Sequence, residues 1–319
     1  MSGATSETPI VAVHSTGDGP SAWVAALKDE MPGVDARPAL EIAGDDLARV
    51  DVSISWRLPH GVLASFPNLK LAQSIGAGVD HILEDPQRPA HVPVARLIDP
   101  FMAGSMTHHI VLQILRWHRQ AAKFERHRAN HFWPMSEAFD HRRLHVAILG
   151  LGALGEHLSR ALTALEIANT GWTRSPRTVE GVASVSGATA LDDLLARSNV
   201  VVCLLPLTAQ TEGILSAELF AKLPEGAFLV NVGRGGHLVE DDLIPALNSG
   251  RLSGAALDVF RQEPLPSDHP FWDDERIYIT PHIAAEVNPP TASIVFAENI
   301  RRIRAGEAPT GLVDLGRGY

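Results

Sequence analysis

Residues 144–165 constrain the fold of this chain more than any other stretch. Residues 144–149 are mostly apolar and β-prone, and Gly150, Gly152 and Gly155 follow them in the pattern G-x-G-x-x-G. An Ala- and Leu-rich helical pattern completes the stretch. Strand, glycines and helix, in that order, are the context that a dinucleotide-binding turn requires. The first glycine permits the tight turn, the second lets the backbone approach a pyrophosphate, and the third lets the helix pack close to the strand.

The start of this helix predicts a phosphate site. Free backbone N–H groups and the helix macrodipole both favour an anion there. A glycine-rich strand-to-helix turn without a ligand is the alternative, but the flanking strand and helix favour nucleotide binding. We therefore expect cofactor contacts from Gly150, Gly152, Ala153, Leu154 and Gly155.

Length and composition indicate an ordinary globular protein. The 319 residues are enough for two domains, with 45% hydrophobic and 20% charged residues. A net charge of -10 argues against a nucleic-acid partner, for which a basic patch is typical. Residues 1–7 carry no signal-peptide pattern, and no apolar run approaches the ~18 residues of a membrane span. We expect a cytoplasmic protein with no membrane partner, whose one cysteine, Cys203, is a buried strand thiol.

Alternating strand and helix signals predict an α/β fold with two parallel-sheet domains, Rossmann- or flavodoxin-like. We expect strands at 9–13, 50–56, 69–75, 168–173, 200–205, 227–232, 254–260 and 276–280. We expect helices at 22–31, 106–119, 216–223, 241–249 and 291–305, the last returning to the first domain. Proline density at 86–100 places the domain crossing at 99–105. Residues 124–139 have no clean period and are either an exposed loop or an arm that packs on another subunit.

Polar or cationic groups follow four predicted strands, at residues 204–208, 231–235, 258–260 and 280–282. Since ligands of open α/β sheets bind beyond the carboxyl ends of strands, these groups are candidates for an active site. Arg234 is a planar cation suited to a carboxylate, although a surface ion pair is the alternative. Taken singly, His282 is better interpreted as an ordinary strand-end histidine, and Glu263 is compatible with a solvated loop acid.

The chain resembles the D-2-hydroxyacid dehydrogenase superfamily over essentially its whole length. The resemblance rests on motifs in family order: GAGVD at 76–80, GLGALG at 150–155, LPLTAQT at 205–211, NVGRG at 231–235, GAALDVF at 254–260, EPLP at 263–266 and TPHIA at 280–284. Within the superfamily it is most similar to the glyoxylate/hydroxypyruvate reductase A type, because of Ser55–Arg57, Phe271–Trp272 and the terminus Arg317–Tyr319.

The resemblance implies a catalytic trio of Arg234, Glu263 and His282. His282 would protonate the ketone oxygen while a nicotinamide delivers hydride to the carbonyl carbon. Glu263 would accept a hydrogen bond from the other imidazole nitrogen, and Arg234 would bind the 2-oxo acid. Backbone N–H groups of Ala77, Gly78 and Val79 would bind the substrate carboxylate. Without the resemblance, this stretch would be interpreted only as a tight turn.

The resemblance also implies a fold in which residues 1–103, completed by 286–319, bind substrate and 104–285 bind the dinucleotide, with an active-site cleft between them. Further cofactor contacts would come from Leu205, Pro206, Thr211, Val232, Gly233, Asp258, His282 and Ala284. A homodimer would involve residues 106–139. The chain carries His108 where the family usually has an acid. Trp56 and Arg57 are expected to influence which substrate binds. The alternative is that Trp56 is a core residue and Arg57 a surface residue.

The cofactor is expected to be NADPH, with NADH possible. In NAD sites an acid about 20 residues beyond the glycines binds the adenosine ribose. The second strand of this chain instead continues into Thr173, Arg174, Ser175 and Arg177, with no acid in that window. Two arginines and a hydroxyl form an anion site suited to a 2′-phosphate, a basic surface turn being the alternative.

The predicted function is therefore NADPH-dependent reduction of small 2-oxo acids, glyoxylate and hydroxypyruvate, by an oxidoreductase without a metal. A 3-phosphoglycerate dehydrogenase is the alternative within the superfamily. A nucleotide-sensing binding protein on the same fold is the alternative from another class.

Overall fold

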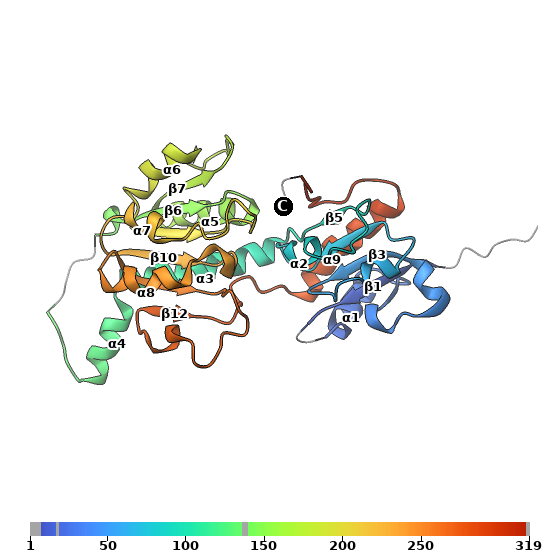
Figure 1. Ribbon diagram of the computed structural model, residues 1–319, viewed down its shortest axis with the longest axis horizontal. Coiled ribbons are helices and arrows are strands. Elements are labelled where there is room, and N and C mark those ends of the chain that lie inside the picture. The colour runs from blue at the N-terminus through green and yellow to red at the C-terminus, as the bar shows by residue number, and fades with distance from the viewer. Residues whose placement is uncertain (1–7, 17–18, 136–139, 317–319) are drawn as a thin grey trace, which may run out of the picture. The chain divides into compact units, whose positions relative to one another are not determined.

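The computed structural model describes residues 8–16, 19–135 and 140–316, and it divides into two compact units (Figure 1). Unit 1 is Met1–Met102 with Val287–Tyr319, and unit 2 is Ala103–Glu286. The N-terminal residues 1–7, the terminus 317–319 and residues 136–139 of the expected loop or arm lie outside the described residues.

Unit 1 holds a parallel sheet with the strand order β2-β1-β3-β4-β5. The strands are β1 (Ile10–His14), β2 (Asp35–Pro38), β3 (Val50–Ser55), β4 (Leu71–Ser74) and β5 (Val94–Ala95). The helices are α1 (Ser21–Glu30), α2 (Asp80–Leu83) and α9 (Pro289–Arg304), with 3-10 turns η1 (Ala39–Glu41), η2 (Gly44–Arg49) and η3 (Leu63–Ser65). This is the flavodoxin-like order, in which the connections change direction between β1 and β3.

The C-terminal helix α9 is held in unit 1 by an aromatic contact and by buried polar groups. The rings of Trp23 in α1 and Phe296 in α9 lie 6.1 Å apart. The guanidinium of Arg304 bonds both carboxylate oxygens of the buried Asp51 at 2.8 and 3.0 Å. Because Asp51 is buried, loss of Arg304 would leave a buried carboxylate unpaired, which keeps the helix in place.

Unit 2 holds a seven-stranded sheet with the order β12-β11-β10-β9-β6-β7-β8, in which every pair is parallel. The strands are β6 (His145–Leu149), β7 (Ala168–Thr173), β8 (Ser184–Ser186), β9 (Val200–Cys203), β10 (Ala227–Asn231), β11 (Leu252–Leu257) and β12 (Ile277–Ile279). The helices are α3 (Pro100–His118), α4 (Ala121–Ala129), α5 (Ala153–Ala164), α6 (Ala188–Leu195), α7 (Ala217–Ala221) and α8 (Glu240–Asn248). Short 3-10 turns are η4 (His141–Arg143), η5 (Gly235–His237) and η6 (Pro270–Asp273).

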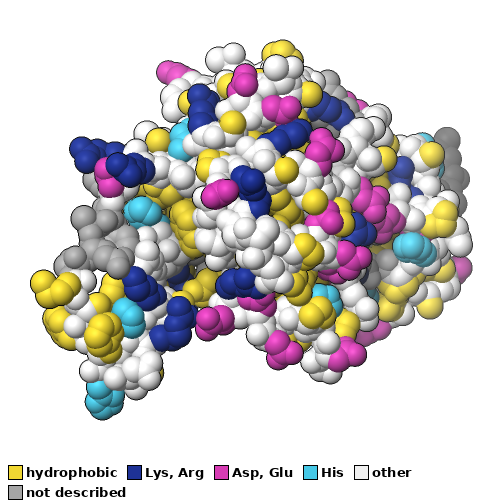
Figure 2. Space-filling model, turned by 60° about the vertical axis from the view of Figure 1, so that its left-hand side comes forward, with side chains coloured by type: hydrophobic (Ala, Val, Ile, Leu, Met, Phe, Trp, Pro, Cys, Tyr) yellow, Lys and Arg dark blue, Asp and Glu magenta, His cyan; other side chains and the backbone are white. Residues whose placement is uncertain are grey.

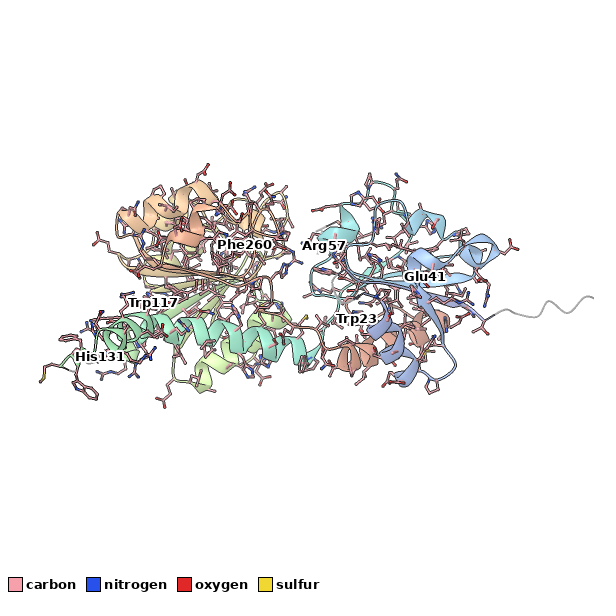
Figure 3. All side chains as sticks on the ribbon, turned by 90° about the horizontal axis from the view of Figure 1, so that it is seen from below. Trp23, Glu41, Arg57, Trp117, His131 and Phe260 are labelled. Carbon is pink, nitrogen blue, oxygen red and sulfur yellow. The ribbon has the colours of Figure 1, made fainter. Side chains whose placement is uncertain are left out.

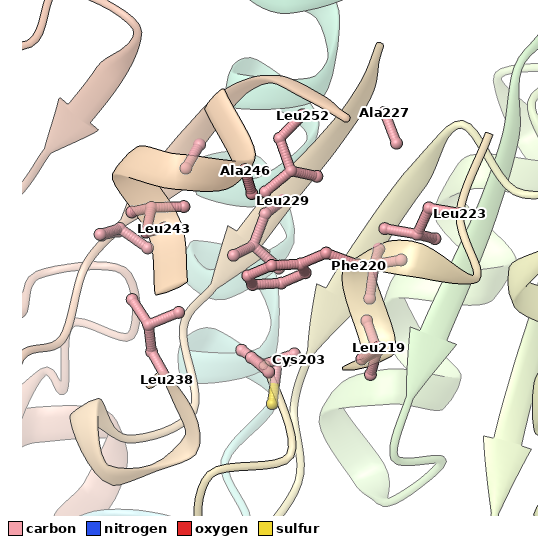
Figure 4. Close-up of a cluster of buried hydrophobic side chains, with 14 of the residues drawn as sticks. Cys203, Leu219, Phe220, Leu223, Ala227, Leu229, Leu238, Leu243, Ala246 and Leu252 are labelled. Atoms are coloured by element: carbon pink, nitrogen blue, oxygen red, sulfur yellow. The ribbon is translucent and has the colours of Figure 1, made fainter. Parts of the chain in front are cut away.

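Both faces of this sheet are buried, which explains why its central strands are apolar throughout. Alternate residues of β9 face opposite cores: Val201 and Cys203 lie in the cluster of Figure 4, and Val200 and Val202 lie in the other. Cys203 is buried, as the sequence predicted, and burial raises the pKa of its thiol to about 12. The thiol is therefore protonated and unreactive at neutral pH.

Several elements differ from the sequence prediction. The strands β2, β5 and β8 were not predicted, since their two to four residues carry little periodic signal. Helix α3 begins at Pro100, six residues before the predicted start at 106, so the expected linker at 99–105 is largely helical. The carboxylate of Asp99 accepts the N–H of Phe101 at 3.0 Å and caps this start.

The segment after α3 is a short helix followed by an exposed strip. Helix α4 (Ala121–Ala129) buries none of its residues, which is why its sequence shows no apolar period. We call residues 121–135 the arm of unit 2, and Figure 3 labels His131 near its outer end. Among the described residues, no helix is both long and apolar enough to cross a membrane.

Candidate active site

The strand order of unit 2 brings the expected site residues to one edge of the sheet. Strands β9, β10, β11 and β12 are consecutive neighbours, and β6 with its glycine turn lies next to β9. Because all these strands are parallel, their carboxyl ends share one edge. The order reverses at β6, which is the switch point where open α/β sheets bind ligands.

The glycine turn between β6 and α5 has the geometry that a pyrophosphate requires. Gly150 has φ +106°, and a Cβ there would lie 2.8 Å from the Leu204 oxygen. A Cβ on Gly155 would lie 2.0 Å from the Gly150 oxygen, so strand and helix approach as closely as backbones can. Gly152 is exposed, with nothing within 4 Å of its missing Cβ. Open space at the second glycine and close contact at the third fit a bound dinucleotide.

The first turn of α5 supplies donors for that phosphate. The N–H of Glu156 donates to the Gly152 oxygen at 3.0 Å and closes the first helical turn. The N–H groups of Ala153, Leu154 and Gly155 come earlier in the helix than Glu156. Like the first N–H groups of any helix, they have no carbonyl acceptor within it. The residues named from the sequence for the cofactor phosphates therefore lie together at one helix N-terminus.

The segment after β7 carries the expected basic residues, but they do not share one environment. Arg174 and Ser175 are exposed, and the hydroxyl of Thr173 donates to the Ser175 oxygen at 2.8 Å. The guanidinium of Arg177 instead donates to the Leu151 carbonyl and to the carboxylate of Glu156. Glu156 was not predicted as a site residue from the sequence, where its only signal is an acid in the first turn of α5.

The loop after β9 is closed by one hydroxyl. Thr211 Oγ1 donates to the Pro206 oxygen at 2.6 Å and accepts the N–H of Thr208 at 2.9 Å. These two hydrogen bonds hold the loop in which Leu205 and Pro206 lie half-buried at the carboxyl edge of the sheet. The side chains of Val232 and Ala284 are buried, so a cofactor contact from them would come through the backbone.

His282 and Glu263 form a hydrogen-bonded pair. His282 Nδ1 lies 2.9 Å from Glu263 Oε2, and the two side chains are 30% and 18% exposed. The second carboxylate oxygen of Glu263 accepts the N–H of Phe260 at 3.2 Å. The carboxylate is thus fixed from one side and orients the imidazole from the other, which leaves Nε2 as the ring nitrogen turned away from Glu263.

The loop that carries His282 is anchored on the buried Asp258. One carboxylate oxygen accepts the Thr280 hydroxyl at 2.6 Å and the Ile283 N–H at 2.9 Å, and the other accepts the Ala284 N–H at 2.9 Å. The N–H of His282 donates to the Asp258 carbonyl at 2.8 Å, and His282 has φ +57°. A left-handed backbone at a non-glycine residue is uncommon and needs such support. Asp258, expected from the sequence to touch the cofactor, directs its side chain at this loop.

Arg234 stands on a turn that is braced by two side chains. Asn231 Nδ2 donates to the Arg234 carbonyl at 3.1 Å, and the buried His237 Nδ1 accepts the Arg234 N–H at 3.0 Å. A Cβ on Gly235 would lie 1.9 Å from the carbonyl carbon of Phe260, labelled in Figure 3. The turn that carries Arg234 therefore packs directly on the loop that leads to Glu263.

In unit 1 the other expected substrate residues follow β3 and β4. Trp56 packs on the glycine turn, since a Cβ on Gly76 would lie 2.9 Å from its ring. The rings of Trp56 and His81 are 4.5 Å apart. Arg57 is exposed and has φ +53°. Half-buried Ala77 and Gly78 lead to the buried Val79, and the Ser74 hydroxyl donates to the Gly78 oxygen at 2.7 Å.

Two histidines of α3 differ in their surroundings. His108, which stands where the family usually has an acid, is exposed, and nothing in the structure explains the change. Burial lowers the pKa of His109, and the Asp258 carboxylate opposes this shift. The His109 imidazole therefore interacts electrostatically with the group that anchors the His282 loop.

A cavity lies apart from this edge of the sheet. A cavity of about 580 Å³ is lined by α3 and α4 and by residues that start β10 and β11, among them Phe228 and Ser253, so it is at the amino ends of the strands. No cluster of three or more His, Cys, Asp or Glu side chains among the described residues is arranged to hold a metal ion.

Comparison with known families gives a match over most of unit 2. Residues 111–284 match the family model described as D-isomer specific 2-hydroxyacid dehydrogenase, NAD binding domain. The match contains the glycine turn and the ends of β9, β10, β11 and β12.

Relatives match nearly the whole chain. Glyoxylate/hydroxypyruvate reductase A of Serratia proteamaculans is 40% identical over 93% of this chain and 96% of its own, and that of Yersinia enterocolitica is 37% identical over the same shares. A D-isomer specific 2-hydroxyacid dehydrogenase from Xanthobacter autotrophicus, solved with NADPH and MES, is 40% identical with a TM-score of 0.91 over 98% of this chain and 99% of that one. The NADPH-dependent glyoxylate/hydroxypyruvate reductase of Sinorhizobium meliloti, solved with NADP and sulfate, is 35% identical with a TM-score of 0.91 over 98% and 100%.

Proposed function

The chain belongs to the D-isomer specific 2-hydroxyacid dehydrogenase family, and from that premise we propose that it reduces small 2-oxo acids with NADPH. Its proposed substrates are glyoxylate and hydroxypyruvate, the compounds named for the relatives at 37 and 40% identity. The observation that carries the proposal is the His282–Glu263 pair at 2.9 Å, on neighbouring strand ends at the same edge of the sheet as the glycine turn.

We propose that His282 is the acid that protonates the substrate oxygen. When bound, NADPH supplies the hydride that the carbonyl carbon receives. Glu263 holds Nδ1, so the proton is donated from Nε2, and the anchored loop keeps that nitrogen in one position. Arg234 binds the 2-oxo acid and stabilises the negative charge that develops on its oxygen.

For the substrate carboxylate, we propose the backbone N–H groups of Ala77, Gly78 and Val79 in unit 1. The Ser74–Gly78 hydrogen bond of 2.7 Å holds this turn open as a set of donors. Trp56, packed over Gly76, and Arg57 are proposed to select the substituent on the 2-oxo acid.

For the cofactor, we propose that Arg174 and Ser175 bind the 2′-phosphate and that Arg177 adds charge. Both exposed side chains follow β7 directly, and the solved relatives from Xanthobacter and Sinorhizobium contain NADPH or NADP. A guanidinium is suited to a phosphate because it donates two parallel hydrogen bonds. The remaining contacts proposed from the sequence come from the glycine turn, from Thr173, from Asp258 after β11, and from the loops after β9, β10 and β12.

We further propose a homodimer in which the arm contacts a second copy. Trp133 and Met135 are 95% and 92% exposed, and Phe132 is 58% exposed. The hydrophobic side chains at the lower left of Figure 2 lie on this arm. An apolar group of this kind is costly in water and is typical of a surface that a partner covers. The cytoplasmic location and the absence of a nucleic-acid partner stay predictions from the sequence.

A steady-state assay tests the proposed activity. We expect oxidation of NADPH that depends on added glyoxylate or hydroxypyruvate, with a higher kcat/KM for NADPH than for NADH. The same assay with 3-phosphohydroxypyruvate tests the alternative phosphorylated substrate. An enzyme that oxidises neither cofactor with any of these acids, or that prefers NADH, contradicts the proposal.

A further inference from the structure

Arg177 is engaged by the chain's own carboxylate. Its guanidinium donates to Glu156 and to the Leu151 carbonyl, and its own carbonyl accepts the Ser184 hydroxyl at 3.0 Å. The Arg177 side chain is 48% exposed and that of Glu156 is 21% exposed. A cation proposed for the cofactor phosphate therefore already has an anionic partner on the cofactor helix.

Glu156 changes the charge of the phosphate site. It lies in the first turn of α5, where the helix dipole stabilises a negative side chain. Arg174, in contrast, has no hydrogen bond or ion pair with any residue in the described ranges. Of the two cations after β7, one is thus neutralised within the chain and one is available to a ligand.

We propose that Glu156 sets the strength of the NADPH preference by competing with the cofactor's 2′-phosphate for Arg177. This rests on the proposed function. The Glu156 carboxylate and a 2′-phosphate compete for the same guanidinium, that of Arg177. The phosphate can bind Arg177 only when the Arg177–Glu156 contact is broken, so Glu156 weakens binding of the phosphorylated cofactor. Glu156 thereby acts as a selectivity-determining residue.

The Arg177–Glu156 pair is not what holds the glycine turn to the sheet. The Leu151 side chain fills the place of a Cβ on Gly171, whose ideal position lies 2.2 Å from it. The N–H of Gly150 donates to the Trp172 oxygen at 3.0 Å. With these contacts intact, removing the charge of Glu156 leaves the turn in place and takes from the Arg177 guanidinium its anionic partner, while the Leu151 carbonyl remains an acceptor.

The test is direct binding of adenosine 2′,5′-bisphosphate and of 5′-AMP, measured by isothermal titration calorimetry on the whole protein. We expect Glu156→Gln to tighten binding of the bisphosphate about two- to five-fold, the range that a partly exposed ion pair contributes. Binding of 5′-AMP changes less, because it lacks the 2′-phosphate. In an Arg177→Gln background the same substitution has no selective effect. The gain shrinks in high salt, since exposed charges are screened.

The matched control is Glu166→Gln, which removes one exposed acid just beyond the other end of α5. It is expected to change neither affinity. The inference is overturned if Glu156→Gln leaves the affinity for the bisphosphate unchanged or lower, if both ligands gain equally, or if the gain persists without Arg177. Failure of the proposed function is seen separately, in a wild type that binds the bisphosphate no better than 5′-AMP. If Glu156→Gln also binds the two ligands equally well, both the proposed NADPH preference and the proposed role of Glu156 are wrong.

Discussion

The substitution Asp258→Asn tests whether the loop that carries His282 depends on one buried carboxylate. Asp258 is 2% exposed and accepts three hydrogen bonds through its two oxygens, at 2.6, 2.9 and 2.9 Å. Asparagine keeps one of these oxygens and replaces the other by an NH₂ group. If the retained oxygen faces Thr280 and Ile283, the NH₂ group is placed against the N–H of Ala284, where two donors meet.

The size of the effect follows from these contacts. One hydrogen bond to a charged group, worth about 1.5–3 kcal/mol, is lost, and a buried N–H is left without its acceptor. We expect the free energy of unfolding of unit 2 to fall by about 2–5 kcal/mol. Because His282 is in the same loop at φ +57°, its ring loses its fixed position, and a displacement of about 1 Å lowers turnover by on the order of 10²-fold.

The assay compares kcat for glyoxylate reduction, thermal unfolding and NADPH binding for the wild type and Asp258→Asn. The control is Asp273→Asn, which makes the same chemical change at an exposed acid in η6. We expect kcat and stability to fall while cofactor binding is largely kept. If NADPH binding falls as much as kcat and stability is unchanged, Asp258 is a direct cofactor ligand and the reasoning from the loop is refuted.

Four further predictions concern single groups. His282→Ala is expected to lower turnover by about two to four decades with NADPH binding nearly retained, as for a positioned general acid, and turnover within a few-fold of wild type would exclude that role. Arg234→Lys is expected to lose much of kcat/KM for glyoxylate because the planar fork is lost, and unchanged kinetics would place Arg234 outside the site. Arg174→Ala is expected to lower kcat/KM for NADPH and not for NADH, and an equal loss with both would contradict the phosphate assignment. Burial lowers the pKa of His145 from 6.5, so stability is full above about pH 6.5 and falls as the pH drops toward the lower folded-state pKa. His145→Gln should flatten this dependence in melting curves between about pH 7.5 and pH 5.5.

The sequence predicts best those elements whose environment is the same on all sides. The central strands β6, β9 and β10 are buried on both faces, so their apolar runs leave no alternative to a parallel sheet. The glycine turn is equally well specified, because backbone contacts at Gly150 and Gly155 exclude a side chain. The strands β2, β5 and β8 are not predicted, because two to four residues are too few to show a period, and helix α4 is not predicted because none of its residues is buried.

The site is predictable to the level of strand ends and no further. The parallel order places Arg234, Glu263 and His282 at one edge, and the motifs that carry them identify the family. Which atom faces which group depends on the loops, whose contacts the sequence pattern does not specify. Asp258 is expected from the sequence at the cofactor, and the structure shows in addition that its carboxylate oxygens bind a loop 22 to 26 residues further along the chain. Sequence spacing does not show such pairings, because they depend on how two turns approach each other in space.

Selectivity between NADPH and NADH is also difficult to predict from a single stretch of the sequence. The window after the second strand of the dinucleotide domain contains no acid, and on that ground the sequence predicts a site that favours a 2′-phosphate. An acid is nevertheless present, because Glu156 reaches Arg177 from the first turn of α5, 21 residues earlier in the chain. The absence of an acid from one strand end is therefore not the absence of an acid from the site. Selectivity for a phosphate depends on the charge that all elements bring together, and in this chain two elements contribute charges of opposite sign.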